Sequence, residues 1–325
     1  MDTRRLVDPA LLPVLDTFPT VALSDALLQP MREAERFAQF PFNGAPEATE
    51  AIEQSLHTAP GPAGAPNIAL TIYTPRNAKH ALPCIYHIHG GGYVGGCAAQ
   101  LEPLHRPAAY ELNCIIISVD YRLAPEHRFP AAIEDCYAGL AWTFANAEAL
   151  GIDRTRIGVM GESAGGGLAA ALALMARDRG QYKLAFQHLI YPMLDDRTCV
   201  TATPNPVAGE FIWTPHNNCF GWSSLLGQAP GGPQVSLYAA PARASELSNL
   251  PPTFIACPTL DLFIDEDVAY AQRLMRAGVP VELHVYPGGF HGFDIFGGEA
   301  PISVRARCDG RAALRRFLLA DVPIR

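Results

Sequence analysis

The pentapeptide Gly-Glu-Ser-Ala-Gly at residues 161–165 constrains the fold more than any other feature of the chain. It follows a strand-like apolar run at residues 156–160 and precedes a helix-like run at residues 167–175. A strand that turns sharply into a helix crowds the backbone, so the positions around the serine must lack large side chains. The hydroxyl is then exposed at a helix N-terminus, which favours developing negative charge. Because such a serine attacks carbonyl carbon atoms, the pattern predicts a hydrolase with Ser163 as nucleophile.

Strand-like and helix-like segments alternate along most of the chain. Alternation of this kind indicates an α/β fold, with a mostly parallel sheet and helices on both of its faces. The 325 residues, 49% of them hydrophobic, are enough for one large domain of this type. The expected strands are residues 67–73, 83–88, 114–119, 156–160, 184–191, 253–256 and 281–286, and the expected helices are residues 130–145, 167–175, 265–277 and 303–319.

Residues 195–250 interrupt the alternation with prolines, glycines and large aromatic residues. We expect this segment and the N-terminal helices, residues 1–45, to form a small helical cap over the catalytic edge of the sheet, because large aromatic residues usually cover something. The alternative is a surface insertion without substrate contact. The catalytic core would then consist of residues 46–194 and 251–325.

Two details of the N-terminal part are also predicted. Residues 11–40 show helical spacing of apolar side chains, with an interruption at Pro30. Residues 44–66 are rich in Ala, Pro and Gly and are typical of a loop around one short strand.

A serine nucleophile needs a base, which is usually a histidine oriented by a carboxylate. His291 lies in the glycine-rich sequence Pro-Gly-Gly-Phe-His-Gly-Phe, directly after an apolar strand. The glycines allow a loop that brings the histidine back over the edge of the sheet. None of the other nine histidines has this context, so His291 is the predicted base.

The carboxylate should stand between the serine and the histidine in chain order. Asp261 follows the strand at residues 253–256 most closely. Asp265, Glu266 and Asp267 are alternatives, but they open the next helix, where the helix dipole alone favours acids. We therefore predict Asp261 as the third member of a catalytic triad.

The sequence His-Gly-Gly-Gly follows another apolar strand, where three glycines allow backbone amides to approach a ligand closely. Ester hydrolysis places negative charge on the former carbonyl oxygen, which backbone N–H donors must meet. We predict an oxyanion hole made by the amides of Gly91, Gly92 and Ala164. His89 and Gly90 are expected to support the loop, His89 by hydrogen bonds rather than by proton transfer.

Composition excludes several other functions. The net charge of −8 and the absence of a basic cluster argue against a nucleic-acid partner. The chain starts without the apolar segment of a secretory signal, and no apolar stretch approaches the length of a membrane span. The eight cysteines form no CxxC pair, so no metal or redox site is expected and reduced, buried thiols are favoured. We therefore expect a cytoplasmic protein.

The chain resembles the hormone-sensitive lipase family of esterases, most closely its microbial members. The resemblance covers roughly residues 65–320. It rests on four sequences besides the aspartate loop that begins at Asp261: His-Gly-Gly-Gly at 89–92, Asp-Tyr-Arg-Leu-Ala-Pro-Glu at 120–126, Gly-Glu-Ser-Ala-Gly-Gly at 161–166 and His-Gly-Phe at 291–293.

The resemblance implies an α/β-hydrolase fold with an eight-stranded sheet and a cap built partly from N-terminal helices. It also implies the triad and oxyanion hole named above, hydrolysis of short acyl esters without a cofactor, and a homodimer that pairs through the edge of the sheet. Two positions depart from the usual family pattern. The aspartate loop reads Asp-Leu-Phe instead of Asp-Pro-Leu, and Glu162 stands where many members have aspartate.

The predicted function is a serine carboxylesterase that hydrolyses small-molecule esters with short-to-medium acyl groups through an acyl-enzyme. An amidase or small-molecule deacetylase with the same triad is the main alternative, because the same residues serve both reactions. A non-catalytic receptor is a remote one, because receptors of this fold have lost the histidine that His291 supplies here. Tyr93, Phe211 and Trp213 are candidates for the walls of the substrate pocket, with ordinary cap packing as the alternative.

Overall fold

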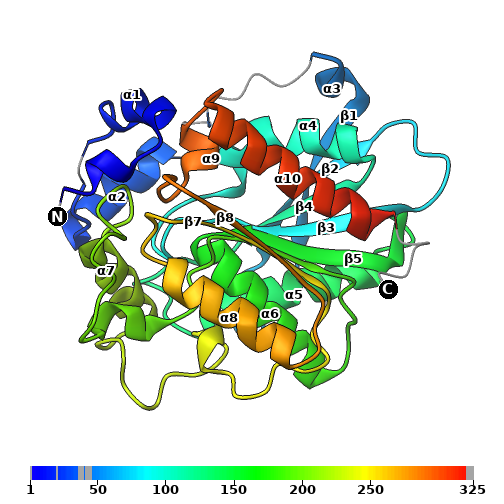
Figure 1. The fold of residues 1–325 in the computed structure, drawn as a ribbon. Helices are drawn as coiled ribbons and strands as arrows, with labels where there is room; N and C mark the ends of the chain where they lie inside the picture. Colours follow the sequence, from blue (N-terminus) through cyan, green and yellow to red (C-terminus); the bar gives the residue numbers. More distant parts are fainter. Residues whose placement is uncertain (1, 20, 36–39, 41–45, 320–325) are drawn as a thin grey trace.

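The structure, a computed structural model, describes residues 2–19, 21–35, 40 and 46–319. Its centre is one eight-stranded sheet with the strand order β1-β2-β4-β3-β5-β6-β7-β8 (Figure 1). β2 is antiparallel to both of its neighbours, and all other neighbouring strands are parallel. The mostly parallel eight-stranded sheet is therefore confirmed. The strands are β1 Ile52–Ala59, β2 Ile68–Pro75, β3 Leu82–Ile88, β4 Ile115–Asp120, β5 Ile152–Glu162, β6 Gln187–Ile190, β7 Thr253–Pro258 and β8 Val281–Tyr286.

Helices cover both faces of the sheet. α5, α6 and α8 lie on one face, and α4 and α10 lie on the other (Figure 1). α1 and α2, drawn in blue, lie at the same end of the molecule as α7. No helix of the described residues is long and apolar enough to cross a membrane. The helices are α1 Leu12–Leu15, α2 Asp25–Glu35, α3 Pro46–Ala51, α4 Glu102–Leu112, α5 Ala131–Ala145, α6 Ala164–Arg179, α7 Pro215–Leu226, α8 Ile264–Arg276, α9 Phe293–Phe296 and α10 Pro301–Leu318.

The central helix α6 is buried on all sides over residues 164–176. Its sequence explains this position, because a helix that is apolar all round needs neighbours on every face. Its first turn is made of small residues that allow very close approach to the sheet. A Cβ atom on Gly165 would lie only 2.1 Å from the carbonyl oxygen of Ile88 in β3. The start of α6 is thereby fixed against the end of the neighbouring strand.

Two predictions for the N-terminal part are wrong. α2 continues through Pro30, where an interruption was expected. Pro30 is exposed, so water can solvate the carbonyl group that loses its helical partner. Residues 46–51 form a helix rather than a loop. Proline is compatible with a first helical position, and the Glu and Ala residues that follow are good helix formers. Gly44 and Ala45 lie outside the described residues.

Besides α3 and the short α9, the sequence prediction missed two longer helices, α4 and α7. α4 has prolines at positions 103 and 107, which masked its helical character. α7 carries a recognisable start and end: Thr214 caps the helix by accepting from the amide of Asn217, Pro215 follows, and Gly227 ends the helix with a positive φ. These signals were available in the sequence.

The two segments that were expected to form a cap contact each other. In α7, the side-chain amide of Asn217 accepts from the amide of Leu23 and donates to the carbonyl oxygen of Val21, both at 2.9 Å. His216 also hydrogen-bonds to the carbonyl oxygen of Leu23 at 3.1 Å. The N-terminal segment is therefore tied to α7, which is almost 200 residues away in the chain.

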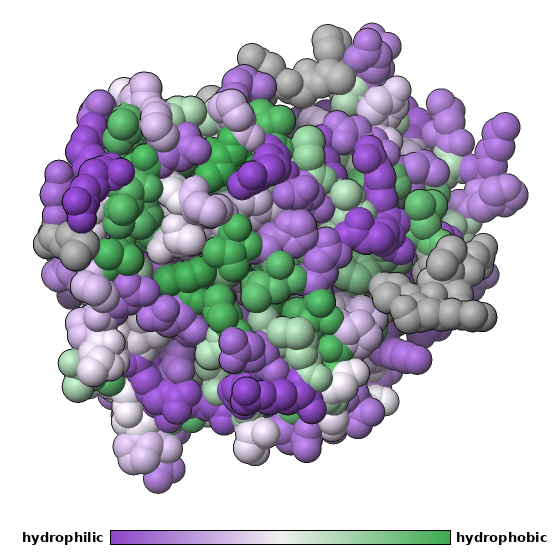
Figure 2. All heavy atoms as spheres, viewed as in Figure 1, coloured by the Kyte–Doolittle hydropathy of each residue, from purple (hydrophilic) through white to green (hydrophobic). Residues whose placement is uncertain are grey.

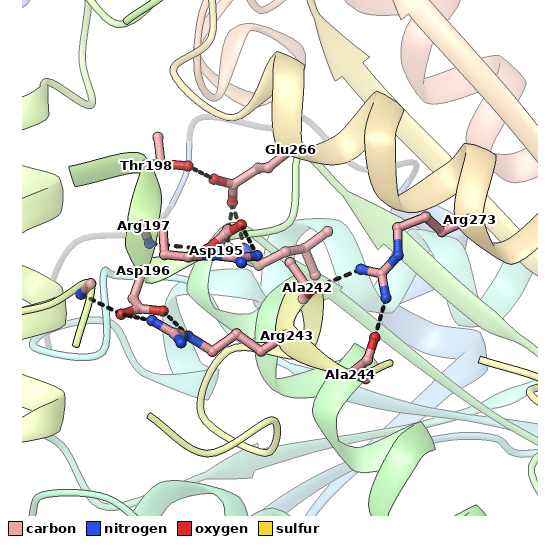
Figure 3. Close-up of polar contacts among 11 residues, drawn as sticks. Asp195, Asp196, Arg197, Thr198, Ala242, Arg243, Ala244, Glu266 and Arg273 are labelled. Carbon is pink, nitrogen blue, oxygen red and sulfur yellow. Dashed lines mark hydrogen bonds and ion pairs between the residues drawn. The ribbon is translucent and has the colours of Figure 1, made fainter. Parts of the chain in front are cut away.

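A buried polar cluster ties the 195–250 segment to the core (Figure 3). Glu266 of α8 accepts hydrogen bonds from the amides of Leu194 and Asp195 and from the hydroxyl of Thr198. Asp196, which is fully buried, pairs with Arg243 through two hydrogen bonds of 2.6 and 3.0 Å. Arg273 of α8 donates to the carbonyl oxygens of Ala242 and Ala244. The beginning and the end of the segment are thus both fastened to α8.

Candidate active site

Ser163 stands at the sharp turn between β5 and α6. Its φ is +56°, a strained value for a residue with a side chain. The flanking glycines are required by close contacts, because a Cβ atom on Gly161 would lie 2.3 Å from the carbonyl oxygen of Gly165. The amide of Ser163 donates to the carbonyl oxygen of Ile190, at the end of β6. The backbone therefore holds this serine in one position at the edge of the sheet.

Ser163, His291 and Asp261 form one continuous hydrogen-bonded series. The Nε2 atom of His291 lies 2.9 Å from the Ser163 hydroxyl, and its Nδ1 atom lies 2.7 Å from Oδ2 of Asp261. Ser163 is 6% exposed, His291 is 7% exposed and Asp261 is fully buried. A carboxylate on Nδ1 favours the tautomer with its proton there, which leaves Nε2 free to accept the serine proton.

The acids that compete with Asp261 do not contact His291. Oδ1 of Asp261 accepts from the amide of Phe263 at 3.0 Å, so both of its oxygens have partners. Asp265 accepts from the side chain of Asn205, and Glu266 belongs to the cluster described above. Asp267 is buried without a hydrogen-bond partner among the described residues, and burial raises its pKa well above the usual range.

The glycine loop after β3 has a backbone that other residues rarely adopt. Gly91 and Gly92 have φ values of +113° and +61°. A Cβ atom on Gly91 would lie 2.2 Å from the carbonyl oxygen of Gly95, and one on Gly92 would lie 2.2 Å from the indole ring of Trp213. Within the described part of the chain, the amides of Gly91, Gly92 and Ala164 have no hydrogen-bond acceptor. They are available donors beside Ser163.

Glu162 joins this loop to the serine turn. Its Oε1 accepts from the amide of Gly90 at 3.2 Å, and its Oε2 lies 2.8 Å from Nε2 of His87 in β3. Burial raises the pKa of Glu162, but the charge and hydrogen bond of His87, together with the Gly90 amide, outweigh it, and the pKa is lowered. The glutamate is therefore held ionised. The sequence analysis gave His87 no role and did not foresee this pair.

His89 contacts the same loop. Its Nδ1 lies 2.8 Å from the carbonyl oxygen of Gly90, and its ring stacks on Tyr121 with a centroid distance of 4.3 Å. The hydroxyl of Tyr121 donates to the carbonyl oxygen of His89. Burial lowers the pKa of His89, which favours the neutral imidazole. Tyr121 belongs to the 120–126 sequence, whose role is thus in packing around the loop.

A cleft of about 340 Å³ opens above Ser163 and His291. Of the three predicted wall residues, only Trp213 is among those that line it in the described structure. Tyr93 is buried below, where its ring packs on Trp222 and its hydroxyl donates to the carbonyl oxygen of Met193. Phe211 packs on the ring of Phe290 instead. The sequence analysis missed several residues that line the cleft: Glu35, Phe40, Tyr191, Ile212, Ile295 and Phe296.

Comparison with known proteins places this geometry in a family. A family model described as an alpha/beta hydrolase fold matches residues 85–295. Carboxylesterase NlhH of Mycobacterium tuberculosis is 35% identical over 97% of both chains. Esterase LipI of the same organism is 33% identical over 98% of this chain and 97% of its own.

A solved structure of a bacterial heroin esterase is also similar. It is 38% identical to this chain, with a TM-score of 0.86 over 97% of this chain and 99% of its own. The predicted fold, family and enzyme class are therefore confirmed. The chain belongs to the α/β-hydrolase family, among its carboxylic ester hydrolases that resemble hormone-sensitive lipase.

Proposed function

We propose that this chain hydrolyses small carboxylic esters through an acyl-enzyme formed on Ser163. The observation that carries the proposal is the series from Ser163 through His291 to Asp261, with distances of 2.9 and 2.7 Å. Beside it stand three backbone amides without an acceptor among the described residues. Nucleophile, base and orienting carboxylate then stand within the distances that acyl transfer requires.

In the first half of the reaction, Nε2 of His291 accepts the proton of Ser163 as the serine oxygen attacks the ester carbonyl carbon. Asp261 holds the imidazole in place and stabilises its positive charge. The amides of Gly91, Gly92 and Ala164 donate to the oxyanion of the tetrahedral intermediate. The intermediate collapses when His291 passes its proton to the departing alcohol, which leaves the acyl group on Ser163.

In the second half, a water molecule takes the place of the alcohol. His291 removes one of its protons as it attacks the acyl carbon, and the same three amides stabilise the second oxyanion. Return of the proton to Ser163 releases the carboxylic acid. Within the described site, His291 is the titratable group that contacts the Ser163 hydroxyl. It therefore serves as base and as acid in both halves of the reaction.

The size of the cleft favours short-to-medium acyl groups. Its volume of about 340 Å³ is near the lower end of small-molecule sites, which hold about 300–1,000 Å³. The indole of Trp213 closes one side of it above Gly92. We also propose that residues 1–45 and 195–250 act together as a cap, which is supported by the contacts of α7 with Val21 and Leu23.

Two further features of the protein are proposed, its oligomeric state and its compartment. β8 forms an open edge of the sheet and carries Val285, which is 42% exposed. Figure 2 shows green apolar surface in the area where Figure 1 draws this strand, which is compatible with a homodimer through that edge. All eight cysteines are free thiols, which favours a reducing compartment such as the cytoplasm. Light scattering and cell fractionation test the two features.

The function is tested with p-nitrophenyl esters from acetyl to palmitoyl. We expect turnover that is highest for short acyl groups and is abolished in Ser163→Ala. Folded wild-type protein without turnover on any ester would overturn the proposal, and so would a Ser163→Ala variant as active as the wild type. A parallel series of matched anilides distinguishes ester from amide hydrolysis.

A further inference from the structure

The charged groups that line the cleft are of one sign. Glu35 and Glu162 both contribute to its wall, and no lysine or arginine does so among the described residues. Glu162 is already committed to His87 and the loop amide of Gly90. Glu35, which comes from α2, is therefore the carboxylate that remains to interact with a substrate.

The position of Glu35 is fixed by the loop beside it. Its Oε2 accepts from the amide of Gly96 at 2.8 Å. Gly96 in turn packs against the oxyanion loop, because a Cβ atom on it would lie 2.4 Å from the carbonyl oxygen of Gly90. Within the described residues, Oε1 of Glu35 accepts no hydrogen bond. The carboxylate thus lines the same cleft as Ser163 and His291, and one of its oxygens has no partner among the described residues.

The arginine that α2 carries within the described residues is engaged elsewhere. Arg32 donates from Nε to the carbonyl oxygen of Val94 at 2.7 Å and from Nη2 to that of Ala124 at 2.6 Å. Its remaining donors bind the carboxylate of Glu126. Arg32 weakens the negative potential of Glu35 from a distance but makes no hydrogen bond to it among the contacts described. A charge in a partly desolvated cleft acts more strongly than one on the surface.

We propose that Glu35 is a specificity-determining residue that selects esters carrying a positive charge, with the cationic group of the substrate placed against its carboxylate. This inference rests on the proposed esterase function and adds the class of substrate. The net charge of −8 also favours the approach of cations to the protein. A neutral acceptor would be enough for the hydrogen bond from the Gly96 amide, whereas attraction of a substrate cation needs the negative charge. The two roles of Glu35 can therefore be separated by a neutral substitution.

The test compares each cationic ester with a neutral ester of the same shape. Acetylcholine is paired with 3,3-dimethylbutyl acetate, which places the charge in the alcohol part. The methyl ester of 4-trimethylammoniobutyrate is paired with methyl 5,5-dimethylhexanoate, which places it in the acyl part. Quaternary ammonium groups keep their charge at every pH. The ratio of kcat/KM within each pair measures the preference for the charge.

Two glutamates of α2 provide the variants. Glu35→Gln keeps an oxygen that can accept from Gly96 and removes only the charge. Glu33→Gln removes the same charge from an exposed position on the same helix. We expect Glu35→Gln to lower the cationic-to-neutral ratio of at least one pair by about ten-fold, mainly through KM, as loss of a partly desolvated charge pair implies. Glu33→Gln should change every ester by less than two-fold, and the ratio divides out any effect of Glu35→Gln that both members of a pair share.

The outcomes separate this proposal from the proposed function. If Glu35→Gln lowers kcat/KM equally for both esters of each pair, the role of Glu35 is purely structural. If it changes kcat/KM for neither ester, Glu35 has no role. Either result overturns the proposal. An equal effect of Glu33→Gln would assign the preference to net charge and overturn it as well. Failure of the wild type to hydrolyse even the neutral esters would instead contradict the esterase function.

Discussion

The cleft has two walls that are built in different ways. The core wall consists of the loop Gly90–Gly92, Ser163 and His291, and its shape depends on backbone with positive φ and on positions where no Cβ atom fits. The cap wall, Glu35, Ile212 and Trp213, presents side chains from segments outside the central sheet. Under the proposed function, the core wall carries the chemistry and the cap wall carries the selectivity. Changes in the core wall should therefore lower kcat for all esters, whereas changes in the cap wall should alter which esters are preferred.

The largest effect is expected at the core wall, for Ser163→Ala. The variant lacks the nucleophile, and kcat should fall by about 10⁴-fold or more, as in other serine hydrolases. Because the cap wall is intact, binding of neutral esters should be nearly unchanged. Stopped-flow kinetics with p-nitrophenyl acetate measure kcat, and equilibrium binding of the same ester measures its affinity. Loss of binding together with kcat would contradict the separation of the two walls.

The next largest effect is expected where the two walls meet, for Gly92→Ala. The new Cβ atom would collide with Trp213, and the φ of +61° is strained for alanine. Displacing the donors of the oxyanion hole should cost about 10²–10³-fold in kcat. Gly64→Ala is the matched control, since it has a φ of +80° but open space around it. It should lose some stability and no activity.

A double variant divides the Gly92 effect into its two causes. In Gly92→Ala with Trp213→Ala, the collision is removed and the strained φ remains. Recovery of most of the lost kcat would assign the effect to the cap wall. We expect only partial recovery, because the amide of residue 92 depends on a backbone conformation that alanine disfavours.

A smaller effect is expected for Trp213→Ala at the cap wall alone. Removal of the indole widens the cleft, so the acyl length with the highest kcat/KM should increase, while kcat on acetyl esters falls by less than about ten-fold, roughly the scale of pocket contacts. Trp213→Phe keeps an aromatic face over Gly92 and should shift the profile less. The chain-length series of p-nitrophenyl esters measures both. An unchanged profile in Trp213→Ala would mean that this residue does not limit the acyl group.

The same contrast explains what the sequence could predict. Ser163, Asp261, His291 and the glycine loop could be singled out because sharp turns and close backbone contacts restrict residue types, and such restrictions leave short motifs at strand ends. The sheet could be predicted because buried strands such as β3 and β4 are mostly apolar. These features are local in the chain, so a single sequence displays them.

The cap wall leaves no comparable signal. Glu35 lies on an amphipathic helix whose sequence is also typical of an ordinary surface helix, and tertiary contacts such as that with Gly96 bring it to the cleft. Trp213 and Phe211 were singled out as large aromatic residues of the 195–250 segment, and Tyr93 as the neighbour of the glycine loop. Tyr93 and Phe211 nevertheless pack elsewhere. Which large residue faces a cleft depends on tertiary contacts that are distant in the chain. Glu162 was missed as the partner of His87 for the same reason.

The smallest effect concerns the pH dependence of the proposed preference for cationic esters. Burial raises the pKa of Glu35 above its ordinary value, although the Gly96 amide and Arg32 oppose the shift. Only the ionised carboxylate attracts a cation, so the preference is present above the pKa of Glu35 and is lost as the pH falls through it. An exposed glutamate titrates at about pH 4.3. Because the pKa of Glu35 is raised, the preference for cationic esters should be lost at a higher pH than that.

The cationic-to-neutral ratio of kcat/KM isolates this titration. Any loss of turnover that is common to both members of a matched pair cancels in the ratio. The ratio should be constant at high pH and fall a few-fold towards unity on acidification, and in Glu35→Gln it should be low and independent of pH. A ratio that rises on acidification would mean that the ionised Glu35 does not attract the cation. A wild-type profile retained in Glu35→Gln would assign the titration to another group and place selectivity for charge outside the cap wall.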